Sequence, residues 1–258
     1  MPERTGFDEL VAEGAALATD GWDFSWFDGR AEEARPPWAY ARLLADRLGA
    51  AHAALDIQTG GGEVFAEALS ESSHLPIVVA ATEHHPANAK IALRNLAPFG
   101  ASVETPPVDG PLPFADGSFD LVTSRHPVKV DWAEISRVLV DGGTYLSQAV
   151  GAGSNSELTE AMMGPQPVGE ARRPETALRL AESAGLEVVD LREAVLRTEF
   201  YDIGAVTYFL RKVPWTVPGF TVEGFRPRLA LLHERIEREG SFVSHSTRFL
   251  IEARRPER

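Results

Sequence analysis

The sequence contains no cysteine, comparatively few basic residues and no long apolar run. Without cysteine the chain can form neither disulfides nor thiolate metal sites, and it has no thiol nucleophile. The apolar run at 77–81 is far shorter than the ~20 residues of a membrane-spanning helix, so we expect no membrane partner. Residues 1–5 lack the basic and apolar segments of a signal peptide, and we expect a soluble, cytoplasmic protein.

The scarcity of positive charge bears on the partners of the protein. Lysine and arginine total 25 against 38 acidic residues, which gives a formal charge of -13. A surface this negative repels phosphate backbones, so we expect no nucleic-acid partner. The pairs Arg172-Arg173 and Arg254-Arg255 are too small to form a binding stripe.

Short apolar runs alternate with amphipathic segments along most of the chain. We expect strands at 53–57, 76–81, 101–103, 119–123, 143–150, 186–191 and 248–253. We expect helices at 7–18, 37–49, 63–69, 86–96, 132–139, 174–184, 202–210 and 225–239, with a short one near Leu158. This alternation predicts βαβ crossovers and a parallel sheet.

The stretch ALDIQTGGGE, residues 54–63, joins an apolar strand to a glycine-rich turn through Asp56. Glycines let the backbone approach a ligand closely, and amides at the following helix start can bind a negative group. Glu83 ends the next expected strand, where a ribose diol would be bound. This pattern suits a nicotinamide dinucleotide and an adenosyl amino acid alike, and a purely structural turn is the third alternative.

Two details favour the adenosyl amino acid. Phe65 occupies the position where the dinucleotide pattern G-x-G-x-x-G requires a small residue. Asp56 precedes the turn, and a carboxylate there suits a cationic sulfonium or ammonium better than a pyrophosphate.

Four segments, in this order, resemble the class I S-adenosylmethionine-dependent methyltransferases, of the small-molecule kind called methyltransferase type 11. They are LDIQTGGG at 55–62, AATEHHP at 80–86, LPFADGSFDLV at 112–122 and EISRVLVDGG at 134–143. The first departs from the family's LDxGxGxG at Gln58. The resemblance spans roughly 55–150 and implies S-adenosyl-L-methionine as the cofactor.

The resemblance also implies cofactor-binding residues. Thr59 and Gly60 would border the methionine end, Glu83 would bind the ribose, and Asp109 would meet the adenine amino group, although the family's aspartate aligns with Val108. The full implied cofactor set is Asp56, Gln58, Thr59, Gly60, Gly62, Glu83, His84, Asp109 and Ser124.

The implied fold is α/β: a seven-stranded, mostly parallel, doubly wound sheet whose last strand is antiparallel. We expect one domain over 1–258, with an N-terminal helical and aromatic lid at 1–50 and a cofactor-binding half at 51–150. The C-terminal half, 151–258, would carry a helical lid insertion between the last two strands, at about 199–245.

His126 follows the expected strand at 119–123, at the edge where open α/β sheets bind ligands. It is our candidate catalytic base, and a histidine that merely packs under the lid is the equal alternative. Methyl transfer needs in-line placement more than a base, so a catalytic residue is not required. We expect no metal, since His84 and His85 are adjacent and lack further ligands at suitable spacing.

The sequence indicates the residues that bind the methyl acceptor less clearly. Trp22 and Trp26 belong to a non-helical aromatic cluster placed before the first strand of the sheet, where it could close over a site. Asp202 and Tyr208 are the polar members of YDIGAVTYFL, a segment similar to one in many relatives, and are candidate substrate contacts.

Gln58 raises a question of its own, because a glycine normally occupies this turn position. We expect it to keep a negative φ and to present its amide to the cofactor or the acceptor. Gln58→Gly should then retain cofactor binding, weakened by about 1 kcal/mol.

Together these features predict a methyltransferase that methylates an O, N or C atom of a small molecule. The alternatives are an RNA or protein methyltransferase, a protein of the same fold that binds the cofactor without transferring methyl groups, and, disfavoured by Phe65, a nicotinamide-dependent oxidoreductase. The oligomeric state is open, a homo-oligomer included.

Overall fold

The computed structural model describes residues 6–19 and 24–257, which divide between two compact units. Unit 1 comprises Met1–Arg35, Ala152–Gly169 and Val195–Thr247, and unit 2 comprises Pro36–Gly151, Glu170–Ala194 and Arg248–Arg258. Each unit is described by itself below. None of the described helices is long and apolar enough to cross a membrane.

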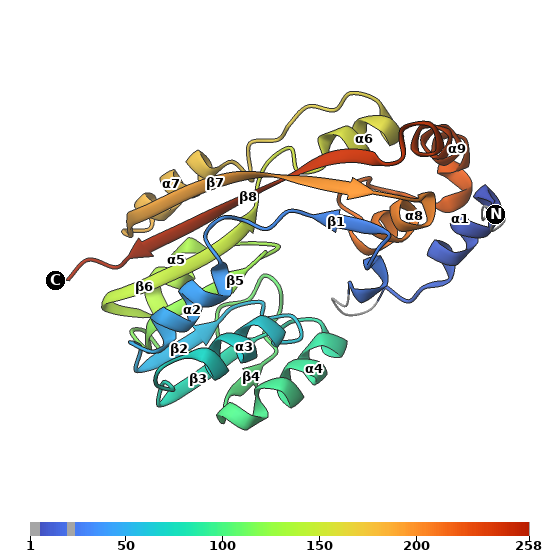
Figure 1. Ribbon diagram of the computed structural model, residues 1–258. Coiled ribbons are helices and arrows are strands. Elements are labelled where there is room, and N and C mark those ends of the chain that lie inside the picture. Colours follow the sequence, from blue (N-terminus) through green and yellow to red (C-terminus); the bar gives the residue numbers. More distant parts are fainter. Residues whose placement is uncertain (1–5, 20–23, 258) are drawn as a thin grey trace. The chain divides into compact units, whose positions relative to one another are not determined.

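Unit 2 is built on a parallel sheet (Figure 1). The strands β2 (Ala53–Asp56), β3 (Val78–Thr82), β4 (Ser102–Glu104), β5 (Phe119–Arg125) and β6 (Leu139–Val150) lie in the order β6-β5-β2-β3-β4. All four residues of β2 are buried, as expected for a central strand covered on both faces. Asp56 pairs with Thr123 at the carboxyl ends of β2 and β5, so the loops that follow these strands leave the sheet together.

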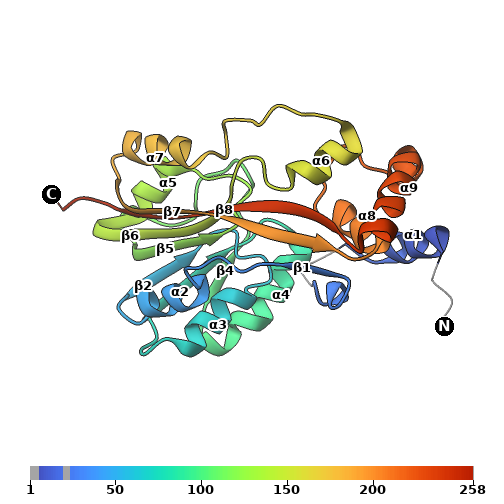
Figure 2. The same cartoon turned by 45° about the horizontal axis from the view of Figure 1, so that its top comes forward.

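Helices cover both faces of this sheet (Figure 2). On one face lie α2 (Tyr40–Leu48), α3 (Glu63–Glu71) and α4 (Pro86–Leu96), followed by the short 3-10 helix η2 (Ala97–Phe99); Leu44, Phe65 and Leu96 are buried against the strands. On the other face lie α5 (Trp132–Val138) and α7 (Pro174–Ser183). The sheet is therefore doubly wound, with a hydrophobic layer on each side.

Two long strands complete the sheet. β8 (Phe242–Arg254) runs antiparallel to β6, with Val150 opposite Arg248 and Thr144 opposite Arg254. β7 (Glu187–Phe200) is its other neighbour and runs opposite to it (Figure 1). Both strands continue from unit 2 into unit 1.

Unit 1 is mainly helical. Besides the ends of β7 and β8 it contains α1 (Phe7–Ala16), η1 (Ser25–Phe27), β1 (Ala31–Glu33), α6 (Ser156–Met163), α8 (Ile203–Lys212) and α9 (Val222–Glu239). α1 and α8 cross at two glycines: a Cβ on Gly14 would lie 2.3 Å from the carbonyl oxygen of Gly204. The two helices therefore pack in direct backbone contact, which no larger residue would permit.

The α/β class and the antiparallel last strand are confirmed; the sheet is mixed, and the expected strand number is wrong. The sheet has eight strands, in the order β1-β7-β8-β6-β5-β2-β3-β4. The extra strand, β1, is three residues long and pairs antiparallel with the end of β7, Ala31 opposite Phe200. Its sequence Ala-Glu-Glu has no apolar alternation, so only the neighbouring β7 backbone makes it a strand.

β7 and β8 are also longer than the expected 186–191 and 248–253. β8 extends from its buried apolar segment into residues 242–247, only some of which are buried, and β7 extends into residues 192–200, whose last part alternates between buried and more exposed positions. The insertion between them holds α8 and α9.

Candidate functional site

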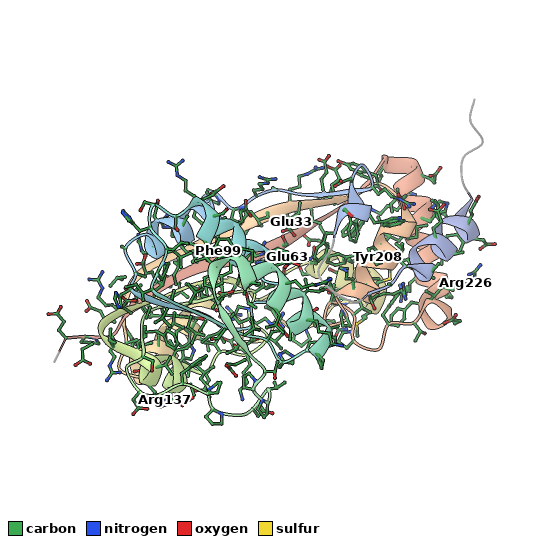
Figure 3. All side chains as sticks on the ribbon, turned by 90° about the horizontal axis from the view of Figure 1, so that it is seen from below. Glu33, Glu63, Phe99, Arg137, Tyr208 and Arg226 are labelled. Carbon is green, nitrogen blue, oxygen red and sulfur yellow. The ribbon has the colours of Figure 1, made fainter. Side chains whose placement is uncertain are left out.

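The turn between β2 and α3 is shaped by its glycines. Gly60 has φ +64° and Gly62, at the N-terminal cap of α3, has φ +76°. A Cβ on Gly62 would approach Leu96 to 3.0 Å, so both backbone angle and space favour glycine there. Glu63 then opens α3 beside the turn (Figure 3). The amides of the turn are thus brought to the carboxyl edge of the sheet.

Gln58 departs from our expectation for its backbone and its side chain. Its φ is +56°, not negative, which places a non-glycine residue in the left-handed region. Its Nε2 donates to the Lys129 carbonyl oxygen at 2.6 Å, and its Oε1 accepts from the Val128 amide at 2.8 Å. Both ends of the carboxamide are therefore engaged by the loop after β5, and these bonds stabilise the left-handed turn.

Asp56 is held at the end of β2 as a buried carboxyl group. It is 5% exposed and accepts from the Thr123 hydroxyl at 2.6 Å. Burial raises the pKa of Asp56 to about 6, only partly offset by the hydrogen bond from Thr123. A positively charged ligand group nearby would remove this penalty, because it stabilises the ionised carboxylate.

Glu83 connects two turns through its carboxylate. Its Oε2 accepts from the Gly60 amide at 2.9 Å and its Oε1 from the His85 amide at 2.7 Å, in a side chain only 4% exposed. The Nδ1 atom of His84 lies 3.6 Å from the same carboxylate. Each carboxylate oxygen still has a lone pair for a hydroxyl donor.

A cavity of about 70 Å³ opens beside these turns in unit 2. Segments after β2, β3, β4 and β5 contribute to its wall, which is mostly apolar. Its lining includes Ile57, Gln58, Thr82, His84, Pro107, Val108, Gly110, Leu112, Ser124, Val128, Lys129 and Tyr145. The expected cofactor residues Gln58, His84 and Ser124 are thereby brought together, and Ser124 is fixed by hydrogen bonds to the Tyr145 and Ser147 hydroxyls at 2.7 and 2.9 Å.

Asp109 is placed differently from the other expected cofactor residues. Its neighbours Val108 and Gly110 line the cavity, but its own side chain is 83% exposed. Its carboxylate accepts from Lys129 Nζ at 2.7 Å, and this pairing lowers the pKa of Asp109. Lys129 therefore links the loop after β4 to the loop that Gln58 holds.

His126 lies in the loop after β5, with φ +54°. Its backbone amide donates to the Gln148 carbonyl oxygen at 2.7 Å, and its Nε2 lies 2.9 Å from Gln148 Nε2. Burial lowers the pKa of His126 well below its usual value, and the nearby charges of Arg125 and Arg248 lower it further. The ring is thus neutral at physiological pH.

Sequence reasoning missed the residues that surround His126. Trp38 Nε1 donates to Gln148 Oε1 at 2.7 Å, and the Tyr40 hydroxyl donates to the Ser124 carbonyl oxygen at 3.1 Å. A glutamine within the apolar strand 143–150 was a usable signal, since a buried carboxamide needs partners. Trp38 carried no such signal, because its partner lies 110 residues away.

The expected substrate residues that the structure describes lie in unit 1 and make contacts there. Trp22 lies outside the described residues. Tyr208 stacks on Phe27 at 5.1 Å and donates to the Ala18 carbonyl oxygen. Asp202 caps α8 by accepting from the Ala205 amide at 2.9 Å.

Arg30 joins Asp202 to the remaining candidate, Trp26. It forms an ion pair with Asp202 at 2.7 Å and lies over the Trp26 ring at 3.9 Å. These contacts explain the packing of the residues; a role in binding the acceptor stays a prediction.

The residues of unit 2 fit an adenosyl amino acid on one further observation. The Thr59 hydroxyl is buried in the middle of the glycine turn without a hydrogen bond of standard geometry among the described residues, although it lies near enough to Asp56 to lower the pKa of that carboxyl group. Buried hydroxyls normally have a partner, so this atom fits a ligand that brings one. Within residues 6–19 and 24–257 we find no group of three or more histidine, aspartate or glutamate side chains arranged to hold a metal.

Comparison with known proteins gives matches at the level of structure. No family model matches the sequence, and no curated protein does either. A Bacillus halodurans protein assigned as a methyltransferase superposes with a TM-score of 0.54 at 19% identity, over 79% of this chain and 92% of that one.

Two further neighbours illustrate the range of proteins with this fold. Geranyl diphosphate C-methyltransferase from Streptomyces coelicolor, in complex with Mg2+, geranyl diphosphate and S-adenosyl-L-homocysteine, has a TM-score of 0.50 at 19% identity, covering 84% of this chain and 77% of that one. The cyclase SpnF has a TM-score of 0.53 at 16% identity, covering 98% and 92%. At these identities the likeness establishes the fold alone: this chain has the Rossmann-like fold of class I methyltransferases.

Proposed function

We propose that the protein is an S-adenosylmethionine-dependent methyltransferase that acts on a small molecule. The observation that carries the proposal is the convergence of Asp56, Thr59 and Glu83 around one glycine turn, with a partly apolar cavity beside it. A structural turn alone would leave neither a buried hydroxyl without a partner nor a buried carboxyl with a raised pKa.

The residues present can hold each part of such a cofactor. Glu83 would accept hydrogen bonds from ribose hydroxyls, with His84 beside it, and the Thr59 hydroxyl would bind the amino-acid end, since the amides of residues 58–60 and 62 already donate within the protein. The cavity wall around Val108 and Leu112 is suited to a flat apolar ring. When bound, the cofactor supplies a methyl group on a sulfonium, and the protein has to place an acceptor lone pair in line with it.

Two neighbours of similar fold support this assignment. Both are described as methyltransferases, and one of them holds S-adenosyl-L-homocysteine with geranyl diphosphate. We propose that the acceptor here is likewise a small molecule, since the charge of -13 disfavours RNA. Acceptor recognition by unit 1, including Trp26, Asp202 and Tyr208, is part of this proposal.

The cyclase SpnF motivates a second candidate function. A chain with this fold can perform a reaction that is not named as methyl transfer, so cofactor binding and transferase activity have to be tested separately. The second candidate is therefore a protein that binds the cofactor and does not transfer its methyl group.

Calorimetric titration with S-adenosylhomocysteine and with NAD tests the cofactor assignment. We expect binding of the first only. In the same titration Glu83→Gln should weaken the binding of S-adenosylhomocysteine. Asp109→Asn is its matched control and should weaken binding less, because each variant neutralises one acid but only Glu83 is buried at the turn. Tight binding of NAD without S-adenosylhomocysteine would refute the proposal.

A screen of small molecules with a radiolabelled methyl donor then separates the two candidate functions. Transfer of label to an acceptor supports the methyltransferase. Binding of S-adenosylhomocysteine without transfer to any compound in a broad panel of O, N and C nucleophiles favours the second candidate.

A further inference from the structure

Three side chains form a hydrogen-bonded relay in unit 2. Trp38, just before α2, donates from Nε1 to Gln148 Oε1 at 2.7 Å. Gln148, on β6, places its Nε2 at 2.9 Å from Nε2 of His126. Trp38 and Gln148 are 5% and 4% exposed, so water does not compete for the hydrogen bond between them.

The chemistry of the three groups fixes the direction of every hydrogen bond. An indole N–H can only donate, so the Gln148 atom that faces Trp38 is the carbonyl oxygen. The other end of the carboxamide is then the NH₂ group, which can only donate to the imidazole. Nε2 of His126 must accept with its lone pair, and the ring proton of a neutral imidazole resides on Nδ1.

We propose that Trp38 and Gln148 are positioning residues that hold His126 as a neutral imidazole with its proton on Nδ1. His126 then acts as a hydrogen-bond donor to an oxygen of the acceptor molecule, and not as the base that removes its proton. The donor role rests on the proposed methyl transfer, whereas the tautomer of His126 does not. A proton that the acceptor loses goes to water.

The surroundings of the ring support the neutral form. Arg125 at the end of β5 and Arg248 on β8 are the charged groups that act on His126, and both oppose a second positive charge. They act in the same direction as burial, which lowers the pKa of the imidazole. The same Gln148 also accepts the His126 backbone amide at 2.7 Å, so ring and backbone are held by one residue.

A neutral Nδ1–H donor restricts the acceptor chemistry. It favours a group with an unprotonated oxygen, such as a carbonyl or carboxylate, next to the atom that receives the methyl group. The base predicted from the sequence would need a free lone pair, but the Nε2 lone pair is occupied by Gln148 and Nδ1 carries the proton.

Nitrogen NMR of histidine-labelled protein tests the tautomer without any ligand. The seven histidines of the chain are distinguished by recording His126→Asn, which removes one set of signals. We expect wild-type His126 to show a protonated Nδ1 and an unprotonated Nε2 at neutral pH. Gln148→Glu replaces the NH₂ donor by a carboxylate that accepts, so it should move the proton to Nε2 and raise the pKa of His126.

Trp38→Phe is the second variant, used also if Gln148→Glu does not fold. It removes the indole donor, so the carboxamide can turn over and both tautomers should appear. A wild-type proton on Nε2, a charged ring at neutral pH, or a tautomer unaffected by both variants would overturn the proposal. Because no cofactor is present, these results stand even if S-adenosylhomocysteine fails to bind.

The donor role is tested with radiolabelled S-adenosylmethionine and the best acceptor from the screen. At a pH above the raised pKa of His126, Gln148→Glu leaves Nδ1 without a proton and unable to donate, so we expect kcat there to fall about tenfold, the loss of roughly one hydrogen bond, with KM for the cofactor unchanged. An unchanged or higher kcat would refute the donor role and restore the base.

Discussion

The turns after β2 and after β5 both contain a non-glycine residue in the left-handed region, but they stabilise it in different ways. Gln58 has φ +56° and His126 has φ +54°. Gln58 uses both ends of its own side chain to bind the backbone of the loop after β5. His126 is bound by Gln148, which engages its backbone amide and only one ring nitrogen.

The difference separates a structural residue from a candidate reacting one. Gln58 binds the loop backbone through both ends of its carboxamide and so stabilises the fold, with one N–H and one lone pair left for a ligand. His126 keeps Nδ1 available. We therefore propose that the turn after β2 binds the cofactor and that the turn after β5 contacts the acceptor. Substitutions at the first should change cofactor affinity, and substitutions at the second should change only transfer.

The largest expected effect is at Glu83. Glu83→Gln keeps the shape but removes the charge and sets an NH₂ group against the amide of Gly60 or His85. We expect affinity for S-adenosylhomocysteine, measured by calorimetry, to fall about a hundredfold, as for a lost charge-assisted hydrogen bond.

His126→Asn is the counterpart of Glu83→Gln on the other turn. Asparagine tolerates the left-handed backbone, so the loop should keep its conformation. We expect the affinity for S-adenosylhomocysteine to stay within about twofold of wild type, a change smaller than one hydrogen bond. A loss as large as that of Glu83→Gln would show that the two turns are not separate in function.

A smaller effect, visible only through its pH dependence, is expected at Asp56. Burial raises the pKa of Asp56 from 3.8 to about 6, so the folded state holds a proton that the unfolded state releases. The stability from this group is present below pH 3.8 and is lost as pH rises through about 6. Asp56→Asn cannot titrate, so its stability relative to wild type should rise by about 1 kcal/mol between pH 5 and pH 8.

Urea unfolding of both proteins at each pH measures this difference without cofactor. A constant offset caused by the new amide cancels in the comparison, because it is the same at every pH. If the difference between the two proteins does not change with pH, Asp56 is ionised at its ordinary pKa, and the turn after β2 has no need of a positive ligand group.

Two substitutions at Gln58 test whether its left-handed backbone is strained. Gln58→Gly removes two hydrogen bonds but relieves the left-handed backbone, so the free energy of unfolding should change by less than about 1 kcal/mol. Gln58→Leu removes the bonds and keeps the strain, so it should be about 1 to 2 kcal/mol less stable than Gln58→Gly. Thermal or urea unfolding measures both.

We still expect Gln58→Gly to lose about 1 kcal/mol in cofactor affinity, because the loop that lines the cavity loosens. Equal stability of the two variants would mean that the left-handed backbone carries no strain at this position.

The sequence predicts those features of the fold and the site whose signals are local. The sheet and its central strands follow from apolar periodicity, and Glu83 and the glycine turn follow from motif spacing, because both signals are local. The hydrogen bonds of Gln58 to residues 128–129 and of Trp38 to Gln148 join residues that lie 70 to 110 positions apart in the sequence, so local patterns could not predict them. The strand β1 likewise exists only through its partner β7.

The smallest expected effect is at Lys129, whose side chain and backbone play different parts. Its carbonyl oxygen accepts from Gln58, while its Nζ binds the exposed Asp109 at 2.7 Å. Lys129→Ala removes only the exposed ion pair, because any residue supplies the carbonyl, and exposed pairs contribute little to stability. We expect neither the melting temperature nor the affinity for S-adenosylhomocysteine to change measurably. The opposite result would be a clear loss of affinity in Lys129→Ala with Gln58→Gly near wild type. It would mean that the Lys129–Asp109 ion pair, and not the hydrogen bonds of Gln58, holds the cavity wall in place. Asp109 would then act on the cofactor through Lys129.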